Sequence, residues 1–180
     1  MKTLTLLRHA KSGWDDPVAR DFDRPLNGKG KRAAELVGRE LRRRSVHFDH
    51  VVASPAVRVV ETLEGIEAGY GEALAPTWER RIYLASAATL LDVIHDLPDS
   101  ADGVLMAGHN PGLEDLVLLL APDSGDTDLR DIVELKYPTA SLAVLALPAD
   151  RWADVAASSA RLTLFLRPRD LDPSLGPDQD

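Results

Sequence analysis

The chain has 180 residues, of which 44% are hydrophobic and 28% are charged. This length and composition predict one soluble domain with its own core and exclude the disordered and fibrous classes. The chain contains no cysteine, which excludes disulfides, thiolate zinc sites and every mechanism that uses a cysteine nucleophile. Its net charge of −8 argues against broad nucleic-acid binding, because such binding needs clustered cations that neutralise backbone phosphates.

The N-terminus has the features of neither a signal peptide nor a membrane span. Only Lys2 precedes the first apolar run, and Arg8 interrupts that run early. No apolar stretch reaches the ~18 residues that a membrane-spanning helix requires. We therefore expect a cytoplasmic protein with no membrane partner.

The first predicted elements are a strand, a long loop and a helix. Residues 2–7 form an apolar run that predicts a buried strand, and residues 10–26 contain the glycine and prolines of a loop. Residues 27–30 predict a turn into a helix. The apolar stripe of this helix recurs every fourth residue, at Ala33, Val37 and Leu41.

A second strand and a second helix follow. Residues 50–53 predict a short strand. Ser54 has the side chain of a helix N-cap and Pro55 suits the first helical position, so a helix is expected to begin here. Asn110 and Pro111 repeat this start signal further along the chain. The remaining predicted elements are helices over 87–95 and 111–120 and strands over 103–107, 140–147 and 161–166.

The alternation of strands and helices predicts an α/β fold. We expect a three-layer α/β/α sandwich with a mostly parallel central sheet, in which the later strands can run antiparallel at one edge. The domain is expected to span residues 1–167. Residues 168–180 are rich in proline and aspartate and are expected to form a flexible C-terminal tail.

Four basic side chains follow three of the predicted strands. Arg8 and His9 come directly after the first strand. Arg58 lies one turn into the helix after the second strand, and His109 follows the third. In parallel α/β sheets, ligands bind outside the carboxyl ends of the strands. We therefore expect the four side chains to converge on one site at that edge.

These residue types in one place indicate phosphoryl transfer. An arginine guanidinium stays charged and binds two phosphate oxygens at once, which suits Arg8 and Arg58. A neutral His9 can attack phosphorus, and His109, expected in its charged form, can hydrogen-bond a transferring oxygen. None of these roles requires a metal or another cofactor.

The same residues lie in four short motifs that follow one another in order. They read Leu-Arg-His-Ala at 7–10, Arg-Pro-Leu-Asn at 24–27, Ser-Pro-Ala-Val-Arg at 54–58 and Gly-His-Asn-Pro at 108–111. Together the motifs resemble the histidine phosphatase superfamily. In its short length and in the sequence Arg-His-Ala-Lys-Ser at residues 8–12, the chain most resembles the SixA-type phosphohistidine phosphatases of that superfamily.

This resemblance implies a fold and a set of residue roles. The fold would be phosphoglycerate mutase-like, and His9 would be the nucleophile that becomes phosphorylated. Arg8, Arg58 and His109 would form the phosphate pocket and take part in catalysis. The expected substrate-binding residues are Arg8, Ser12, Arg24, Arg58 and His109.

Many members of the superfamily carry a carboxylic acid after the second helix, where it protonates the leaving group. In this chain the matching segment, residues 78–86, contains one carboxylate, Glu79. Glu79 is the candidate general acid, but the arginines at 80 and 81 favour its ionised form, and it can equally be a solvated surface charge. An alcohol needs a proton in order to leave, whereas imidazole leaves phosphohistidine readily. The poor acid therefore favours a phosphohistidine substrate.

We expect a metal-independent phosphatase that dephosphorylates phosphohistidine in a partner protein, such as a phosphotransfer domain or a phosphocarrier. Two alternatives stay open. One is a phosphatase or mutase of small phosphate esters, and the other is a non-catalytic module that binds phosphoproteins. An intact His9 argues against the binding module, because such a module needs no nucleophile.

The loop over residues 10–26 brings two further candidate features. Trp14 can line the mouth of the site or pack as a plug. Four basic residues in or near the loop can guide an acidic partner or form a solvated face: Arg20, Arg24, Lys29 and Lys31.

Overall fold

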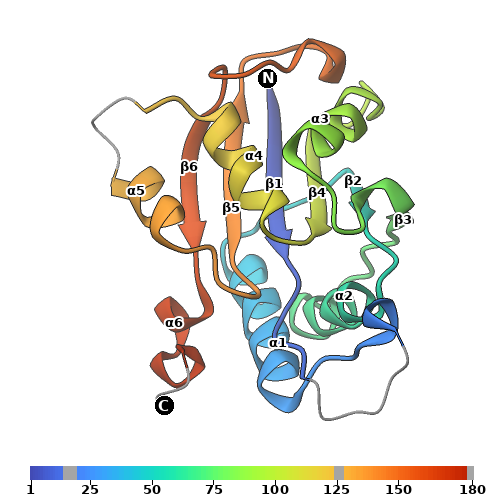
Figure 1. The fold of residues 1–180 in the computed structure, drawn as a ribbon, viewed down its shortest axis with the longest axis vertical. Coiled ribbons are helices and arrows are strands. Elements are labelled where there is room, and N and C mark those ends of the chain that lie inside the picture. The colour runs from blue at the N-terminus through green and yellow to red at the C-terminus, as the bar shows by residue number, and fades with distance from the viewer. Residues whose placement is uncertain (14–19, 124–127, 178–180) are drawn as a thin grey trace.

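The computed structural model describes residues 1–13, 20–123 and 128–177 (Figure 1). Trp14 and residues 178–180 of the predicted tail lie outside the described residues. The strands are β1 (Lys2–Arg8), β2 (His50–Ala53), β3 (Thr77–Trp78), β4 (Gly103–Gly108), β5 (Leu142–Leu147) and β6 (Arg161–Leu166). The helices are α1 (Gly28–Arg43), α2 (Val57–Tyr70), α3 (Ala87–His95), α4 (Gly112–Leu120), α5 (Asp128–Leu135) and α6 (Pro168–Leu171). The shorter 3-10 turns are η1 (Asp21–Asp23), η2 (Arg80–Ile82), η3 (Trp152–Asp154) and η4 (Pro173–Leu175).

The strands form one mixed sheet in the order β3-β2-β4-β1-β5-β6. β1 pairs in parallel with β4, and β2 runs parallel to both β4 and β3. On the other side of β1, β5 pairs antiparallel with both β1 and β6. The prediction of an α/β fold with a mostly parallel sheet is therefore confirmed. In the described ranges, no helix combines the length and the apolar character that crossing a membrane requires.

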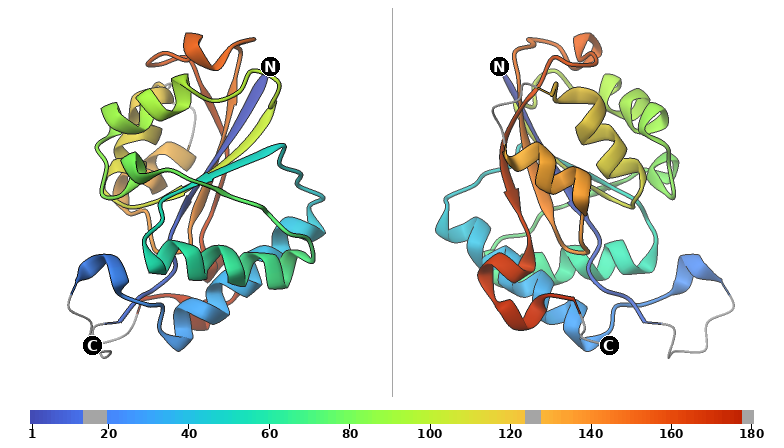
Figure 2. Two further views of the ribbon diagram at one scale, coloured as in Figure 1. Left: turned by 90° about the vertical axis from the view of Figure 1, so that its right-hand side faces the viewer. Right: turned by 60° about the vertical axis from the view of Figure 1, so that its left-hand side comes forward.

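Helices cover both faces of the sheet (Figure 2). Along β1, Leu4 and Leu6 belong to the core under α3, α4 and α5, whereas Leu7 belongs to the core under α1 and α2. β4 alternates in the same way, with Met106 on the first face and Leu105 on the second. Successive side chains of a strand point to opposite faces, so a strand that is covered on both faces needs a nearly continuous apolar run, which Thr5 alone interrupts between Leu4 and Leu7 of β1.

Helices α1 and α2 approach each other closely because glycines lie at their contact. A Cβ atom at Gly38 would lie 2.2 Å from the carbonyl oxygen of Ile66, and one at Gly69 would lie 2.0 Å from that of Glu35. A larger residue at either position would force the two helices apart. The contact therefore sets how closely α2, which carries Arg58, packs against α1.

Most predicted elements match the structure, and the differences have simple causes. The prediction that Ser54 caps a helix is wrong, since α2 begins at Val57 with Ala56 as its N-cap. Two elements, β3 and α5, were not predicted. β3 has two residues, too few to show a period. α5 carries Leu129, Ile132 and Val133 at helical spacing, but the helix is short and directly follows a segment rich in proline, glycine and aspartate that is typical of a loop.

The described part of the predicted tail, residues 168–177, forms α6 and η4 and lies beside α1 (Figure 1). Pro168 is buried, and the Nζ atom of Lys29 in α1 donates a hydrogen bond of 2.6 Å to the carbonyl oxygen of Gly176. This segment therefore packs on the domain and forms part of its surface. The flexibility expected of residues 168–180 stays a prediction.

Candidate active site

A pocket of about 360 Å³ opens where β1 and β4 end. We call it the edge pocket. In the described ranges, no three histidine, aspartate or glutamate side chains gather closely enough to hold a metal ion. The residues that line the edge pocket are Arg8, His9, Lys11, Ser12, Asp21, Arg24, Arg58, Leu84, His109, Asn110 and Thr139.

His9 is held with one ring nitrogen ready to react. It is 7% exposed, and its Nδ1 atom lies 2.7 Å from the carbonyl oxygen of Ala10. Because a carbonyl oxygen can only accept, Nδ1 carries the proton and Nε2 keeps its lone pair. Burial, helped by the charges of Arg58 and Arg8, lowers the pKa of His9 to about 3. His9 is therefore neutral at physiological pH, with an unprotonated Nε2 atom.

His109 is also neutral, which corrects the charged form expected from the sequence. Its Nε2 atom lies 2.8 Å from the Oγ atom of Ser54, and its Nδ1 atom lies 3.3 Å from Nη2 of Arg58. Because a guanidinium can only donate, Nδ1 accepts this bond and Nε2–H donates to Ser54. Burial and the charge of Arg58 lower the pKa of His109 to about 3. Its ring centroid lies 5.4 Å from that of His9.

Arg8 and Arg58 bring buried positive charge to the pocket. Arg58 is 2% exposed, and Nη1 of Arg8 donates a hydrogen bond of 2.7 Å to the carbonyl oxygen of Tyr137. Burial lowers the pKa of the Arg8 guanidinium. Within the described part of the chain, the Nε atoms of both arginines are buried without a hydrogen-bond partner. Since buried polar groups are normally paired, both guanidinium groups retain donors for an oxyanion.

The edge pocket also contains a carboxylate that the sequence analysis missed. Asp21, in η1, accepts hydrogen bonds from Nη2 of Arg58 over 3.0 Å and from the hydroxyl of Tyr83 over 2.7 Å. Arg24 donates to its other carboxylate oxygen over 3.1 Å. Burial by itself would raise the pKa of Asp21, but these partners lower it to about 2. Asp21 is therefore ionised at neutral pH, and its position in space is what distinguishes it from Asp23 in the same turn.

Thr62 connects the backbone next to His9 to α2. The backbone N–H of Ala10 donates to the Oγ1 atom of Thr62 over 2.9 Å. The same hydroxyl donates to the carbonyl oxygen of Arg58 over 2.6 Å, and both bonds are buried. Thr62 thereby couples the residue after His9 to the first turn of the helix that carries Arg58.

The structure brings two further candidates into the pocket and leaves one outside. Ser12 and Arg24 line the pocket, and Nη1 of Arg24 donates to the hydroxyl of Ser12. Glu79 does not line it, and pairs instead with Arg81 over 3.1 Å. Hydrogen bonds from Arg81 lower the pKa of Glu79. An ionised carboxylate outside the pocket is poorly placed to donate a proton, and the role of Glu79 as the general acid stays an untested prediction.

The fold and this pocket define the class of protein. The family model described as "Histidine phosphatase superfamily (branch 1)" matches residues 4–81. The uncharacterized protein Rv1276c of Mycobacterium tuberculosis (strain ATCC 25618 / H37Rv) is 37% identical over 166 residues, which cover 91% of this chain and 100% of that protein. The chain belongs to the histidine phosphatase superfamily.

Two solved structures place the chain more closely within the superfamily. A proposed phosphohistidine phosphatase SixA from Nakamurella multipartitia has a TM-score of 0.78 at 31% identity, over 93% of this chain and 96% of that chain. Another, from Agrobacterium tumefaciens, has a TM-score of 0.74 at 29% identity, over 92% of this chain and 97% of that chain. Within the superfamily, the chain is of the SixA type.

Proposed function

We propose that this chain is a phosphatase that forms a phosphohistidine on His9 and removes the phosphoryl group from phosphohistidine in a protein. The observation that carries this proposal is the state of His9, which is neutral and buried with Nε2 unprotonated. The guanidinium groups of Arg8 and Arg58 line the same pocket. Together these groups supply the nucleophile and the positive charge that a transferring phosphoryl group requires. The names of both SixA relatives support the same activity.

The reaction takes two displacements at phosphorus. In the first, Nε2 of His9 attacks the phosphorus, and the P–N bond to the substrate imidazole breaks. The leaving imidazole nitrogen takes up a proton from solvent. In the second, water attacks the phosphorus, and the electron pair of the bond to Nε2 returns to the nitrogen. Inorganic phosphate leaves with the oxygen and protons of the water. The arginines stabilise the charge on the transferring oxygens in both steps, without a metal in the proposed scheme.

The protonation states in the pocket favour cleavage of a P–N bond. Among the described residues that line the edge pocket, Asp21 is the one carboxylate, and with a pKa of about 2 it carries no proton at neutral pH. The hydroxyl of Tyr83 already donates its hydrogen to Asp21. Departure of an alcohol requires a proton donor, whereas departure of imidazole from phosphohistidine requires much less assistance. A phosphohistidine substrate therefore fits these groups better than an alkyl phosphate does.

Hydrolysis assays with and without the nucleophile test this proposal. A phosphohistidine-bearing protein and an aryl phosphate are each incubated, without added metal, with the wild type, His9→Ala and His47→Ala. We expect the wild type to hydrolyse phosphohistidine faster than the ester. His9→Ala should lower the rate by roughly 10³-fold or more, because the proposed nucleophile is removed. His47→Ala removes an exposed histidine outside the pocket and should keep the wild-type rate.

A phosphoenzyme trap completes the test. An acid-labile, alkali-stable phosphate on the wild type, absent from His9→Ala, identifies the intermediate. If the wild type prefers the aryl ester, the proposed site stands but the proposed phosphohistidine substrate is wrong. Phosphate binding without turnover of either substrate would show a binding module and contradict the proposal.

A further inference from the structure

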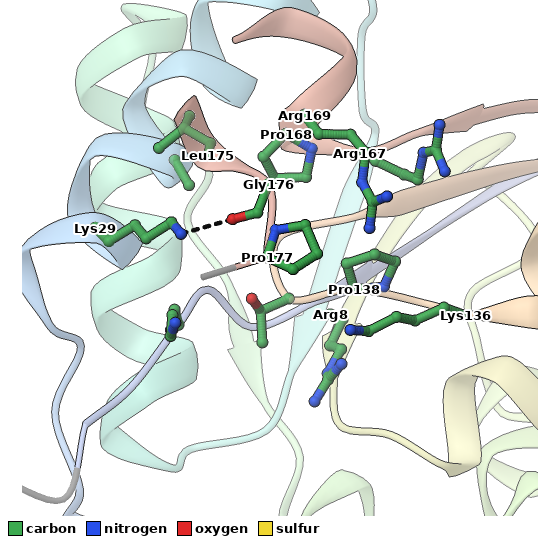
Figure 3. Close-up of a pocket in the computed structure, with 13 residues that line it drawn as sticks. Arg8, Lys29, Lys136, Pro138, Arg167, Pro168, Arg169, Leu175, Gly176 and Pro177 are labelled. Carbon is green, nitrogen blue, oxygen red and sulfur yellow. Dashed lines mark hydrogen bonds between the residues drawn. The ribbon is translucent and has the colours of Figure 1, made fainter. Parts of the chain in front are cut away.

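A second hollow, of about 260 Å³, opens beside the edge pocket (Figure 3). It shares Arg8, Lys11 and Thr139 with the edge pocket, so the two hollows adjoin. No acidic side chain is found among the described residues that line it. We call it the basic hollow, and its basic lining residues are Arg8, Lys11, Lys29, Lys136, Arg167 and Arg169.

Segments far apart in the sequence bring these cations together. Lys29 comes from the first turn of α1, Lys136 follows α5, and Arg167 and Arg169 flank the start of α6. In Figure 3, Lys29 lies on one side of the hollow and Lys136 on the opposite side. The bond from Lys29 to the carbonyl oxygen of Gly176 holds the C-terminal wall of the hollow against α1. The hollow is therefore a product of the fold rather than a run of basic residues.

The charge in the basic hollow is only partly compensated. Arg167 forms an ion pair of 2.9 Å with Asp170. For Lys136 and Arg169, no carboxylate within ion-pair distance occurs among the described residues, and Arg169 shares the more distant charge of Asp170 with Arg167. Six of the 21 lysines and arginines gather here in a chain whose net charge is −8. Such a concentration of like charge in a concave site favours a bound anion.

We propose that the basic hollow binds a second oxyanion of the substrate, a carboxylate or phosphate group carried close to the phosphoryl group that reacts at His9. Arg8 lines both hollows and would contact both anions. The inference rests on the phosphoryl transfer proposed at His9. In a phosphoprotein the second oxyanion is an aspartate or glutamate side chain near the phosphohistidine, and in a small substrate it is a second phosphate group.

Two phosphohistidine peptides of equal length test whether the second oxyanion is a carboxylate side chain of a protein substrate. One carries aspartates on both sides of the phosphohistidine, and the other carries asparagines. At low salt we expect the wild type to hydrolyse the aspartate peptide with a kcat/KM about tenfold higher, the scale of two partly exposed ion pairs. The double variant Lys136→Ala/Arg169→Ala should lose most of this preference and keep the wild-type kcat/KM on the asparagine peptide, because neither residue lines the edge pocket.

A matched variant controls for overall charge. Arg151→Ala/Arg161→Ala also removes two positive charges, from exposed positions that line neither hollow, and should keep the preference. Calorimetry with inorganic phosphate and pyrophosphate then tests whether the second oxyanion is a phosphate group of a small substrate. This measurement of binding does not require turnover. Loss of pyrophosphate affinity in the Lys136/Arg169 variant alone would identify a second phosphate as the anion.

The outcomes separate this inference from the proposed function. Equal behaviour of the wild type and both double variants, with both peptides and both anions, would overturn the second site. If the wild type hydrolyses neither peptide but binds pyrophosphate in a manner that depends on Lys136 and Arg169, the proposed function fails and the second site stands.

Discussion

Asp21 places a negative charge inside a pocket that otherwise gathers positive charge. Its carboxylate binds Arg58 and Arg24, two of the groups that a phosphate would also contact. An incoming phosphate therefore competes with Asp21 for these guanidinium groups. At the level of single residues, we expect Asp21 to hold Arg58 and Arg24 in the free pocket and to weaken the binding of the phosphate product.

Replacing Asp21 with asparagine tests this competition. Asp21→Asn keeps an acceptor oxygen but removes the charge, so inorganic phosphate should bind roughly two- to fivefold more tightly, as expected for loss of a partly exposed ion pair worth up to about 1 kcal/mol. Competitive inhibition by phosphate measures the change. Asp23→Asn serves as the control, since Asp23 lies in the same 3-10 turn but outside the edge pocket. Weaker phosphate binding by Asp21→Asn would mean that Asp21 mainly holds Arg58 in its productive position.

At the scale of elements, the α1–α2 contact determines how the pocket wall is supported. α2 carries Arg58 and Thr62, and its distance from α1 depends on glycines that no side chain can replace without movement. This dependence opposes the usual effect of glycine, which destabilises a helix interior relative to alanine. The sign of the change in the free energy of unfolding on replacing a glycine with alanine therefore shows whether that glycine is needed for the close packing of α1 and α2.

Gly38→Ala should lower the free energy of unfolding by about 1–3 kcal/mol, because the new Cβ would overlap the carbonyl oxygen of Ile66. Gly28→Ala, in the first turn of the same helix, should be neutral or slightly stabilising, because its Cβ would meet Arg32 at an ordinary contact of 3.5 Å. Urea unfolding of both variants measures the difference. A stabilising Gly38→Ala would show that the helices can separate at little cost.

At the scale of the whole molecule, two buried neutral histidines make stability depend on pH. Folding lowers the pKa of both His9 and His109 from 6.5 to about 3. Between these values the unfolded chain binds more protons than the folded one, so the free energy of unfolding falls as the pH falls from 6.5 towards 3. Each histidine contributes a slope of up to about 1.4 kcal/mol per pH unit in this window.

Urea unfolding at several pH values between 7 and 4 tests this linkage. The wild type should lose stability steadily below pH 6.5, and His9→Gln/His109→Gln should show a distinctly flatter profile. His47→Gln, which changes an exposed histidine, should retain the wild-type slope. Equal slopes for the wild type and the double variant would show that the two buried histidines do not cause the pH dependence of the free energy of unfolding.

The sequence predicted the core of the fold because its signals are local. The apolar run of β1 and the four-residue period of α1 are readable within a few turns of chain, and both elements form where predicted. The expectation that Arg8, His9, Arg58 and His109 lie near one another followed from a general rule of parallel sheets, and the structure brings them into one pocket. The roles proposed for them still depend on the assays described above.

The strand and helix pattern and the residue types at the strand ends could therefore be read from the chain alone, because periodicity and strand ends are local properties. The folded arrangement was needed to show the protonation states of His9 and His109, the entry of Asp21 into the pocket and the position of Glu79 outside it. It also assembled the basic hollow from α1, the segment after α5 and the C-terminal segment. Burial, charge pairing and cavity shape depend on residues that are distant in the chain, and these residues come close to one another only when the chain folds.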